Sequence, residues 1–231
     1  MLFLNVPYED KDLAKSLGAK WNDSKKSWYV ENFYDYYKFG YWIIPKGGVN
    51  VGISLENLFL VEGIRKCFKC GKQTKVVGFS YGQVLLLNHN AYLDSNNNLI
   101  KPNSPLMTES RWENAKQYEI MSAINVQKLP RKFSEINADK LKNDYGIGYD
   151  YSKMANEEYF ANHCKYCNTI QGDFYLFEEE DGPFNLNSDE KIAKLIFKKI
   201  KLTSDILVYY NKNVFFNSLP KISVSDYSWI A

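Results

Sequence analysis

The sequence is poor in the residues on which most catalytic and nucleic-acid-reading sites depend. Its 231 residues include two histidines, His89 and His163, and three arginines, at positions 65, 111 and 131. Histidine is the commonest general acid or base, and arginine is the commonest reader of guanine edges and phosphate forks. No metalloprotease helix or kinase-like set of residues is present. We therefore predict no catalytic residues and no sequence-specific reading of duplex DNA.

Long apolar runs are also missing. No stretch reaches the ~18 consecutive apolar residues that a membrane-spanning helix needs, and runs such as Val84 to Leu87 are of strand length. Met1 leads into a short apolar segment that Pro7 interrupts, without the basic leader or cleavage site of a secretory signal. We expect a soluble, cytoplasmic protein with no membrane partner, whose cysteines stay reduced.

Neither sign of charge dominates. The formal net charge is +2, with +4 in residues 1–80 and −2 in residues 81–231. A protein that binds nucleic acid usually has a basic patch or a high isoelectric point. By contrast, aromatic residues are plentiful, with 18 Tyr, 14 Phe and 5 Trp. They either fill a strand-rich core or form an aromatic binding face.

Four cysteines form two Cys-x-x-Cys pairs, Cys67 with Cys70 and Cys164 with Cys167. Two intervening residues let both thiolates of a pair turn toward one ion. We predict one structural zinc ion, because four thiolates close the coordination shell and leave no position for substrate. Iron, two disulfides and redox chemistry at one pair are the alternatives.

The two pairs are far apart, with 93 residues between Cys70 and Cys164. A compact zinc finger has roughly 12–20 residues there. We therefore expect the metal to join two distant hairpins. His163 is expected to be a neighbour of the metal, since four ligands are already present.

The N-terminal segment has the pattern of a small strand–helix–strand module, predicted to end at residue 46. Residues 2–6 and 27–30 are predicted strands, and residues 9–17 a helix that Gly18 ends. This module contains three characteristic runs: L-N-V-P-Y at 4–8, L-G-A-K-W at 17–21 and W-Y-V at 28–30. They resemble a bacterial module of unknown function that often opens proteins of plasmids and phages, including primase-like and antirestriction-like ones. The resemblance implies a context associated with nucleic acids.

The rest of the chain resembles an uncharacterised bacterial group that joins this module to a split four-cysteine zinc ribbon. The resemblance lies in Cys67-Phe-Lys-Cys70-Gly71 and in the run from Tyr159 to Cys167. Asn168 stands where a knuckle usually has glycine. The resemblance implies that the metal centre organises a second domain, predicted to span residues 53–231.

Within that second domain we predict strands at 57–66, 74–79, 84–88 and 174–178, after a loop at 47–52. Helices are predicted at 108–127, 137–145 and 189–202, the last capped by Ser188 with Ile196 in its buried stripe. The opposite face of that helix would be basic. Residues 206–210 and 214–216 are expected to form a hairpin. The predicted fold class is α+β.

Two functions fit these features. The first is a non-catalytic accessory that binds single-stranded or duplex nucleic acid without sequence preference, through lysines that contact phosphates and aromatic rings that stack on bases. The predicted phosphate contacts are Lys20, Lys25 and Lys26, and the predicted stacking residues are Trp21, Trp28 and Tyr29. The second is a protein-interaction adaptor or structural factor whose exposed aromatic residues meet a partner chain.

Overall fold

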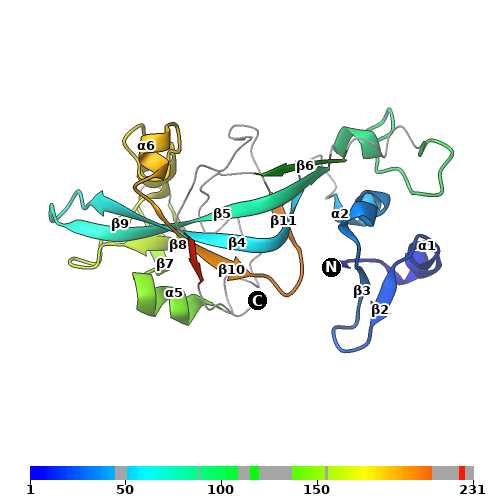
Figure 1. Cartoon of the computed structure of the whole chain (residues 1–231), viewed down its shortest axis with the longest axis horizontal. Helices are drawn as coiled ribbons and strands as arrows, with labels where there is room; N and C mark the ends of the chain where they lie inside the picture. The colour runs from blue at the N-terminus through cyan, green and yellow to red at the C-terminus, as the bar shows by residue number, and fades with distance from the viewer. Residues whose placement is uncertain are drawn as a thin grey trace. The chain divides into compact units, whose positions relative to one another are not determined.

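A computed structural model describes residues 1–44, 51–87, 89–108, 115–119, 137–153, 156–209 and 224–226. Strands and helices both occur in it, which confirms the predicted α+β class (Figure 1). The chain forms two compact units. The first comprises Met1–Glu56, Gln83–Tyr118 and Thr203–Asn213, and the second Asn57–Gly82, Glu119–Leu202 and Val214–Ala231. The predicted division into residues 1–46 and 53–231 stays a prediction.

The first unit begins with a small antiparallel sheet in the order β1-β3-β2. Its strands are β1 (Leu2–Leu4), β2 (Lys20–Asn22) and β3 (Ser27–Val30). The 3-10 helix η1 (Tyr8–Asp10) and the helix α1 (Lys11–Ser16) connect β1 to β2. The predicted strand–helix–strand order is confirmed, while β2 was not predicted as a strand. Gly18 follows α1 at φ +102°, a conformation that favours glycine.

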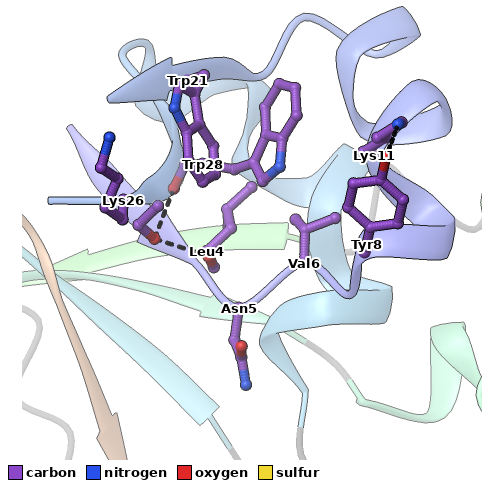
Figure 2. Close-up of a pocket in the computed structure, with 9 residues that line it drawn as sticks. Leu4, Asn5, Val6, Tyr8, Lys11, Trp21, Lys26 and Trp28 are labelled. Carbon is purple, nitrogen blue, oxygen red and sulfur yellow. Dashed lines mark hydrogen bonds between the residues drawn. The ribbon is translucent and has the colours of Figure 1, made fainter. Parts of the chain in front are cut away.

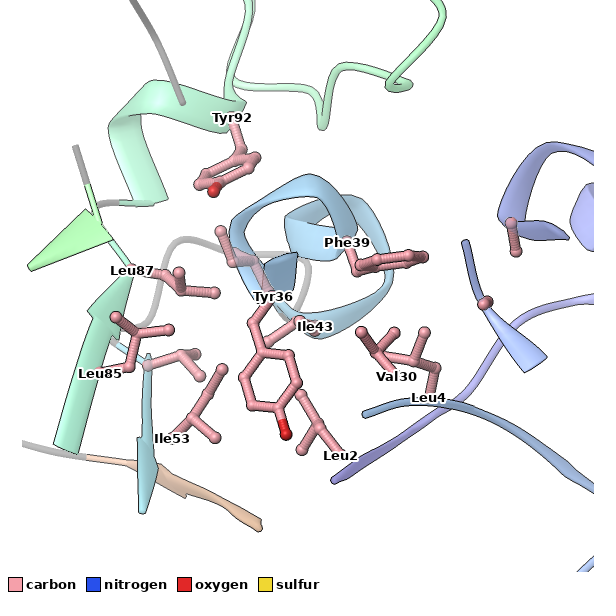
Figure 3. Packing of buried hydrophobic residues seen from close by; sticks show 14 of the residues in the cluster. Leu2, Leu4, Val30, Tyr36, Phe39, Ile43, Ile53, Leu85, Leu87 and Tyr92 are labelled. Atoms are coloured by element: carbon pink, nitrogen blue, oxygen red, sulfur yellow. The ribbon is translucent and has the colours of Figure 1, made fainter. Parts of the chain in front are cut away.

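Tyr36 lies at the centre of the core of the first unit (Figure 3). It belongs to the 3-10 helix η2 (Phe33–Phe39), which leads into α2 (Gly40–Ile43). The Tyr36 hydroxyl donates to Asp205 Oδ2 at 2.5 Å, and the Met1 amino group lies 3.3 Å from the same oxygen. The buried carboxylate of Asp205 is thereby paired.

Gly40 in α2 packs closely against a second buried ring in this core. Tyr92 belongs to the 3-10 helix η3 (His89–Tyr92), and its hydroxyl donates to Tyr37 O at 2.8 Å. A Cβ atom on Gly40 would lie 2.1 Å from Tyr92 Cε1, so only glycine fits.

Two long strands belong to both units, β4 (Val51–Lys66) and β5 (Gln73–Leu87), and they are neighbours in one sheet. In the first unit, β11 (Ile206–Tyr209) pairs antiparallel with the start of β4. The strand β6 (Ala115–Glu119) lies beside β5.

In the second unit, β10 (Ile196–Lys201) pairs antiparallel with residues 57–62 of β4, and β12 (Val224–Asp226) pairs parallel with β10. A three-stranded sheet contains β7 (Gly148–Ser152), β8 (Glu157–His163) and β9 (Ile170–Gln171). The described residues of this unit also form three short helices: α5 (Ala138–Tyr145), the π-helix η5 (Phe174–Glu178) and α6 (Asp189–Ile192).

Glu62 on β4 is the centre of a buried polar network in the second unit. Its side chain is 4% exposed and accepts from the Tyr145 hydroxyl at 2.6 Å, while Lys198 and Lys75 form ion pairs with it. Burial alone would raise the pKa of Glu62, but Lys198, Tyr145 and Lys75 together lower it. The network fastens α5 to β4, β5 and β10.

Several predicted elements are wrong. The helix predicted at 189–202 ends after Ile192, and its second half is the strand β10, because pairing with β4 buries Phe197 and leaves Ile196 51% exposed. The basic face predicted for a helix over residues 189–202 is therefore not formed. The Ser188 cap is confirmed, since Ser188 Oγ accepts from Lys191 N.

The other errors involve strands. Residues 174–178 are helical instead of extended, and residues 115–119 of the predicted helix 108–127 form β6. The strands predicted at 74–79 and 84–88 are parts of the single strand β5, and residues 51–52 of the predicted loop belong to β4. The helix predicted at 137–145 is confirmed as α5. Residues 214–216 and the rest of 108–127 lie largely outside the described residues.

Candidate metal centre and aromatic pocket

The four cysteines come together in the second unit. One sulfur atom from each of Cys67, Cys70, Cys164 and Cys167 lies within 4.8 Å of the other three. The cysteines are free, with the sulfurs of Cys67 and Cys167 at 3.6 Å and those of Cys70 and Cys164 at 3.7 Å. These distances exclude disulfide bonds in this structure, since a disulfide requires about 2.05 Å.

The two turns that carry the cysteines, called the knuckles below, have the same backbone hydrogen bonds. In the first, Cys67 N donates to Lys72 O and Gly71 N donates to Cys67 O, both at 2.9 Å. In the second, Cys164 N donates to Thr169 O and Asn168 N to Cys164 O, again at 2.9 Å. Gly71 has φ +71° and Asn168 φ +54°, the left-handed conformation that glycine and asparagine tolerate best. Asn168 thus replaces the usual glycine without changing the turn.

The donor set fits a metal ion. Four sulfurs around an ion at about 2.3 Å in a tetrahedron would be about 3.8 Å apart, close to the measured 3.6 and 3.7 Å. Four thiols this close cannot all ionise unless a cation neutralises them. The cysteines could therefore hold one metal ion.

The backbone of the knuckles favours thiolates at two positions. Hydrogen bonds from the Thr169 hydroxyl and backbone N–H lower the pKa of Cys167 to about 6. Burial raises the pKa of Cys67, but the backbone N–H groups of Cys70 and Lys69 outweigh it, so the pKa lies below its ordinary value. For Cys70, the Lys72 N–H lowers the pKa, but burial and the other thiols raise it to about 11.

Buried polar side chains hold the knuckles in place. Asn162 on β8 bonds both backbone groups of Val77 on β5, which ties the strand before the second knuckle to the strand after the first. Gln171 Nε2 lies 3.6 Å from Cys67 Sγ and donates to Thr169 O at 2.9 Å. The His163 ring contacts Gly146 O and Asp150 Oδ2 instead of the thiols, so it is a neighbour of the centre, as predicted.

The first unit contains an aromatic pocket of about 340 Å³ (Figure 2). Figure 2 shows the Trp21 and Trp28 rings next to each other, with Tyr8 and Lys11 across from them. Trp21 and Trp28 are partners on β2 and β3, and their ring centroids are 5.5 Å apart in an edge-to-face arrangement. The remaining lining residues are Leu4, Asn5, Val6, Lys26 and Ser27.

Strand pairing separates the six predicted nucleic-acid residues into two groups. Trp21, Trp28 and Leu4 form one cross-strand row, and side chains alternate between faces along a strand. Lys20 and Tyr29 belong to the next row, on the opposite face, where Lys20 pairs with Glu31 at 2.6 Å.

Lys25 lies over the ring of Phe3, which shares that opposite face. Of the six predicted residues, only Trp21, Trp28 and Lys26 therefore line the pocket. Sequence reasoning missed Tyr8 and Lys11, although Tyr8 ends the L-N-V-P-Y run. Their side chains are joined, with Lys11 Nζ donating to the Tyr8 hydroxyl at 2.7 Å.

The second unit has a wide groove of about 860 Å³ beside the metal centre. Asp150 and Ser152 on β7 and Glu157 and Tyr159 on β8 are paired residues on one face of the sheet and form part of its lining. Exposed rings also line it, among them Phe68 (68% exposed), Phe174 (57%) and Tyr151 (52%).

Comparisons with known proteins agree with the N-terminal resemblance. Residues 1–43 match the family described as "Domain of unknown function (DUF5710)". Over 40 residues the chain is 50% identical to DNA primase TraC of Escherichia coli, a segment that covers 17% of this chain and 3% of that primase. No solved structure matches the chain. The N-terminal module is thus similar to a short segment of a DNA primase.

Among the described residues, no helix combines the length and the apolar character that crossing a membrane requires.

Proposed function

We propose that this chain is a non-catalytic, zinc-containing protein whose N-terminal unit binds single-stranded nucleic acid without sequence preference. The zinc assignment rests on the chemistry of the donor set, since four thiolates in tetrahedral reach favour zinc, with iron as the alternative. Four protein ligands complete the shell, so the ion stabilises the fold and is not a site of chemistry.

The aromatic pocket is the observation that carries the nucleic-acid proposal. Trp21 is 45% exposed and Tyr8 79% exposed, although large aromatic rings are usually buried. Two indole rings and a phenol around one concave space offer stacking surfaces for an unpaired base. A base inside a duplex is stacked and paired, so it could not enter such a pocket.

Charge around the pocket supports the same ligand. Lys11 and Lys26 line it, and the Lys26 ammonium lies 3.9 Å from Asp23 on an exposed turn, a weak pairing that phosphate can replace. The similarity of residues in this segment to a DNA primase fits a ligand of this kind. Lys20, Lys25 and Tyr29, on the opposite face of the sheet, are expected to contribute little.

The test is fluorescence anisotropy of the full chain with a labelled single-stranded oligothymidine and a duplex of equal length, titrated with salt. Loss of one stacking contact costs about five- to 150-fold in affinity, the range expected of base–aromatic stacking. We expect such a loss for Trp21→Ala and for Tyr8→Ala. Tyr34→Ala is the matched control, because Tyr34 is 70% exposed in the same unit but does not line the pocket.

A comparison of two double lysine variants tests the proposed phosphate contacts. Lys11→Ala with Lys26→Ala should weaken binding and reduce its salt dependence, whereas Lys20→Ala with Lys25→Ala should not. Equal affinity for single strand and duplex, unchanged by any of these substitutions, would overturn the proposal.

The groove of the second unit favours a second candidate function, a protein-interaction adaptor. Exposed aromatic side chains are enriched in protein interfaces, and Phe68, Tyr151 and Phe174 line this groove together. Three carboxylates, Asp150, Glu157 and Asp173, also line it, which disfavours a polyanion there. Selection of displayed peptides on the full chain, repeated with Phe174→Ser, would test this candidate.

A further inference from the structure

The knuckles of the metal centre carry exposed lysines without accompanying carboxylates. Residues 65–75 and 159–172 contain no Asp or Glu. Five lysines of these segments are exposed, and four of them remain when Lys75, which pairs with Glu62, is set aside: Lys66, Lys69, Lys72 and Lys165.

These four lysines differ from the other cations nearby. Arg65 bonds to Tyr175 O and pairs with Glu179 at 3.5 Å, and Lys75 pairs with Glu62 at 3.4 Å. Within the part of the chain that the structure describes, none of the four exposed lysines forms an ion pair. Clustered cations without anions repel one another, which favours binding of an external anion.

Two of the lysines lie over one aromatic ring, and a third lies in the first knuckle. Lys72 Nζ and Lys165 Nζ lie 4.9 and 5.9 Å from the centroid of Tyr166, and the Lys66 side chain lies beside Gly71. The Tyr166 side chain is 54% exposed. The Lys165 backbone N–H donates to Thr74 Oγ1 at 3.0 Å, so β5 fixes the position of the second knuckle. These residues form what is called the knuckle surface below: Lys66, Lys72, Lys165 and Tyr166.

Compensation of the metal centre does not account for this charge. Four thiolates around a divalent ion carry a net charge of −2, and the three lysines of the knuckle surface carry +3, so a net +1 remains there. The lysines are also exposed, whereas the sulfurs of Cys67 and Cys164 belong to buried residues.

The acidic groove bounds the basic region on one side. Phe68 and Lys69 line that groove together with Asp150, Glu157 and Asp173, whereas Lys72, Lys165 and Tyr166 do not line it. Positive charge is therefore concentrated where Tyr166 is exposed.

We propose that the knuckle surface is a second binding site for single-stranded nucleic acid. Lys66, Lys72 and Lys165 contact backbone phosphates, and an unpaired base stacks on Tyr166 between the lysines. A duplex would offer the phosphates but no free base face for the ring. This site lies in the second unit and does not depend on the aromatic pocket of the first unit.

The experiment uses the full, metal-loaded chain and a labelled single-stranded oligothymidine in fluorescence anisotropy. Lys72→Glu with Lys165→Glu is compared with Lys142→Glu with Lys194→Glu, two exposed lysines elsewhere in the same unit. Both double variants change the formal net charge from +2 to −2, so a general charge effect is matched. Metal content and thermal unfolding are measured for each variant to verify folding.

We expect the knuckle variant to bind about tenfold or more weakly than the control variant, and its salt slope to fall by about 1.4, the value for two lost phosphate contacts on a single strand. Tyr166→Ala should lose about fivefold or more without changing that slope. Equal weakening by both double variants would overturn the inference.

The two proposed sites can be judged separately in the same assay. Loss of binding in Trp21→Ala with no effect of the knuckle variant would refute the second site and leave the proposed function intact. The opposite pattern would support the knuckle surface and refute the pocket.

Discussion

The Asn162 side chain bonds both backbone groups of Val77, with its Oδ1 accepting from Val77 N at 2.7 Å and its Nδ2 donating to Val77 O at 2.9 Å. The side chain occupies the place that a neighbouring strand would take. Asn162 is 5% exposed, so water cannot replace these bonds. One residue, His163, separates it from Cys164, and the Asn162–Val77 bonds thereby position the second knuckle against the first.

Replacing Asn162 should consequently destabilise the second unit. Asn162→Ala leaves the buried N–H and C=O of Val77 without partners, at a cost of roughly 2–5 kcal/mol in the free energy of unfolding. Urea denaturation measures the change. Asn143→Ala, at an exposed position of α5, is the control and should change stability by less than about 0.5 kcal/mol. A similar small effect at Asn162 would contradict the bonding described above.

Removing the metal should unfold part of the chain. A chelator should lower the thermal midpoint, and added Zn²⁺ should restore it, because ligand binding to such a site contributes directly to folding. Cys70→Ser should reduce metal content and stability together. Elemental analysis is expected to find about one zinc per chain, and alkylation four free thiols after its removal. Two disulfides in the purified protein would contradict the metal assignment.

Gly40 offers a test of core packing in the first unit. Gly40→Ala should destabilise by about 1–3 kcal/mol or more, since the new methyl group would overlap the Tyr92 ring. Gly148→Ala is the matched control, because no atom lies within 4 Å of the corresponding Cβ position. Thermal unfolding of both variants gives the comparison, and equal midpoints would mean that η3 moves away from α2 easily.

The lowered pKa of Asp10 predicts that the stability of the first unit depends on pH. Its buried carboxylate accepts from Lys101 Nζ at 2.7 Å and from Trp42 Nε1 at 3.1 Å, and the Lys101 bond is the largest cause of its lowered pKa. A carboxylate with a lowered folded-state pKa contributes stability that is fully present above its unfolded pKa, ordinarily 3.8. This contribution should be lost as the pH falls from there through the lowered value.

Asp10→Asn should therefore flatten the fall in unfolding free energy below about pH 4, relative to the wild type. Asp12→Asn, at an exposed position of α1, should leave the profile unchanged. Chemical denaturation at several pH values is the measurement. Parallel curves for Asp10→Asn and the wild type would show that the Lys101 pair does not stabilise the fold.

The sequence was most informative where local chemistry decides the structure. The Cys-x-x-Cys spacing already requires a tight turn, so both knuckles could be located before any fold was known. Gly18 and Ser188 likewise mark real helix ends. Proximity of the two knuckles followed from the expectation that one ion needs four thiolates.

Elements whose conformation depends on pairing with another strand were harder to predict. Residues 196–201 have isoleucines at a spacing compatible with a helix, and only the neighbouring β4 determines that they form a strand with Phe197 buried. The pocket could not be derived either, because the alternation of β2 depends on its pairing with β3. That pairing places Trp21 and Lys20 on opposite faces.

The long separation between the two knuckles sets an order of events during synthesis. Cys67 and Cys70 leave the ribosome 97 residues before Cys164 and Cys167 respectively, so a nascent chain of intermediate length can offer a metal ion only two thiolates. At 5–20 residues per second, this interval lasts roughly 5–20 seconds. The first unit's N-terminal sheet can form during that time, whereas the second unit must wait for its last ligands, and incomplete chains would hold metal weakly.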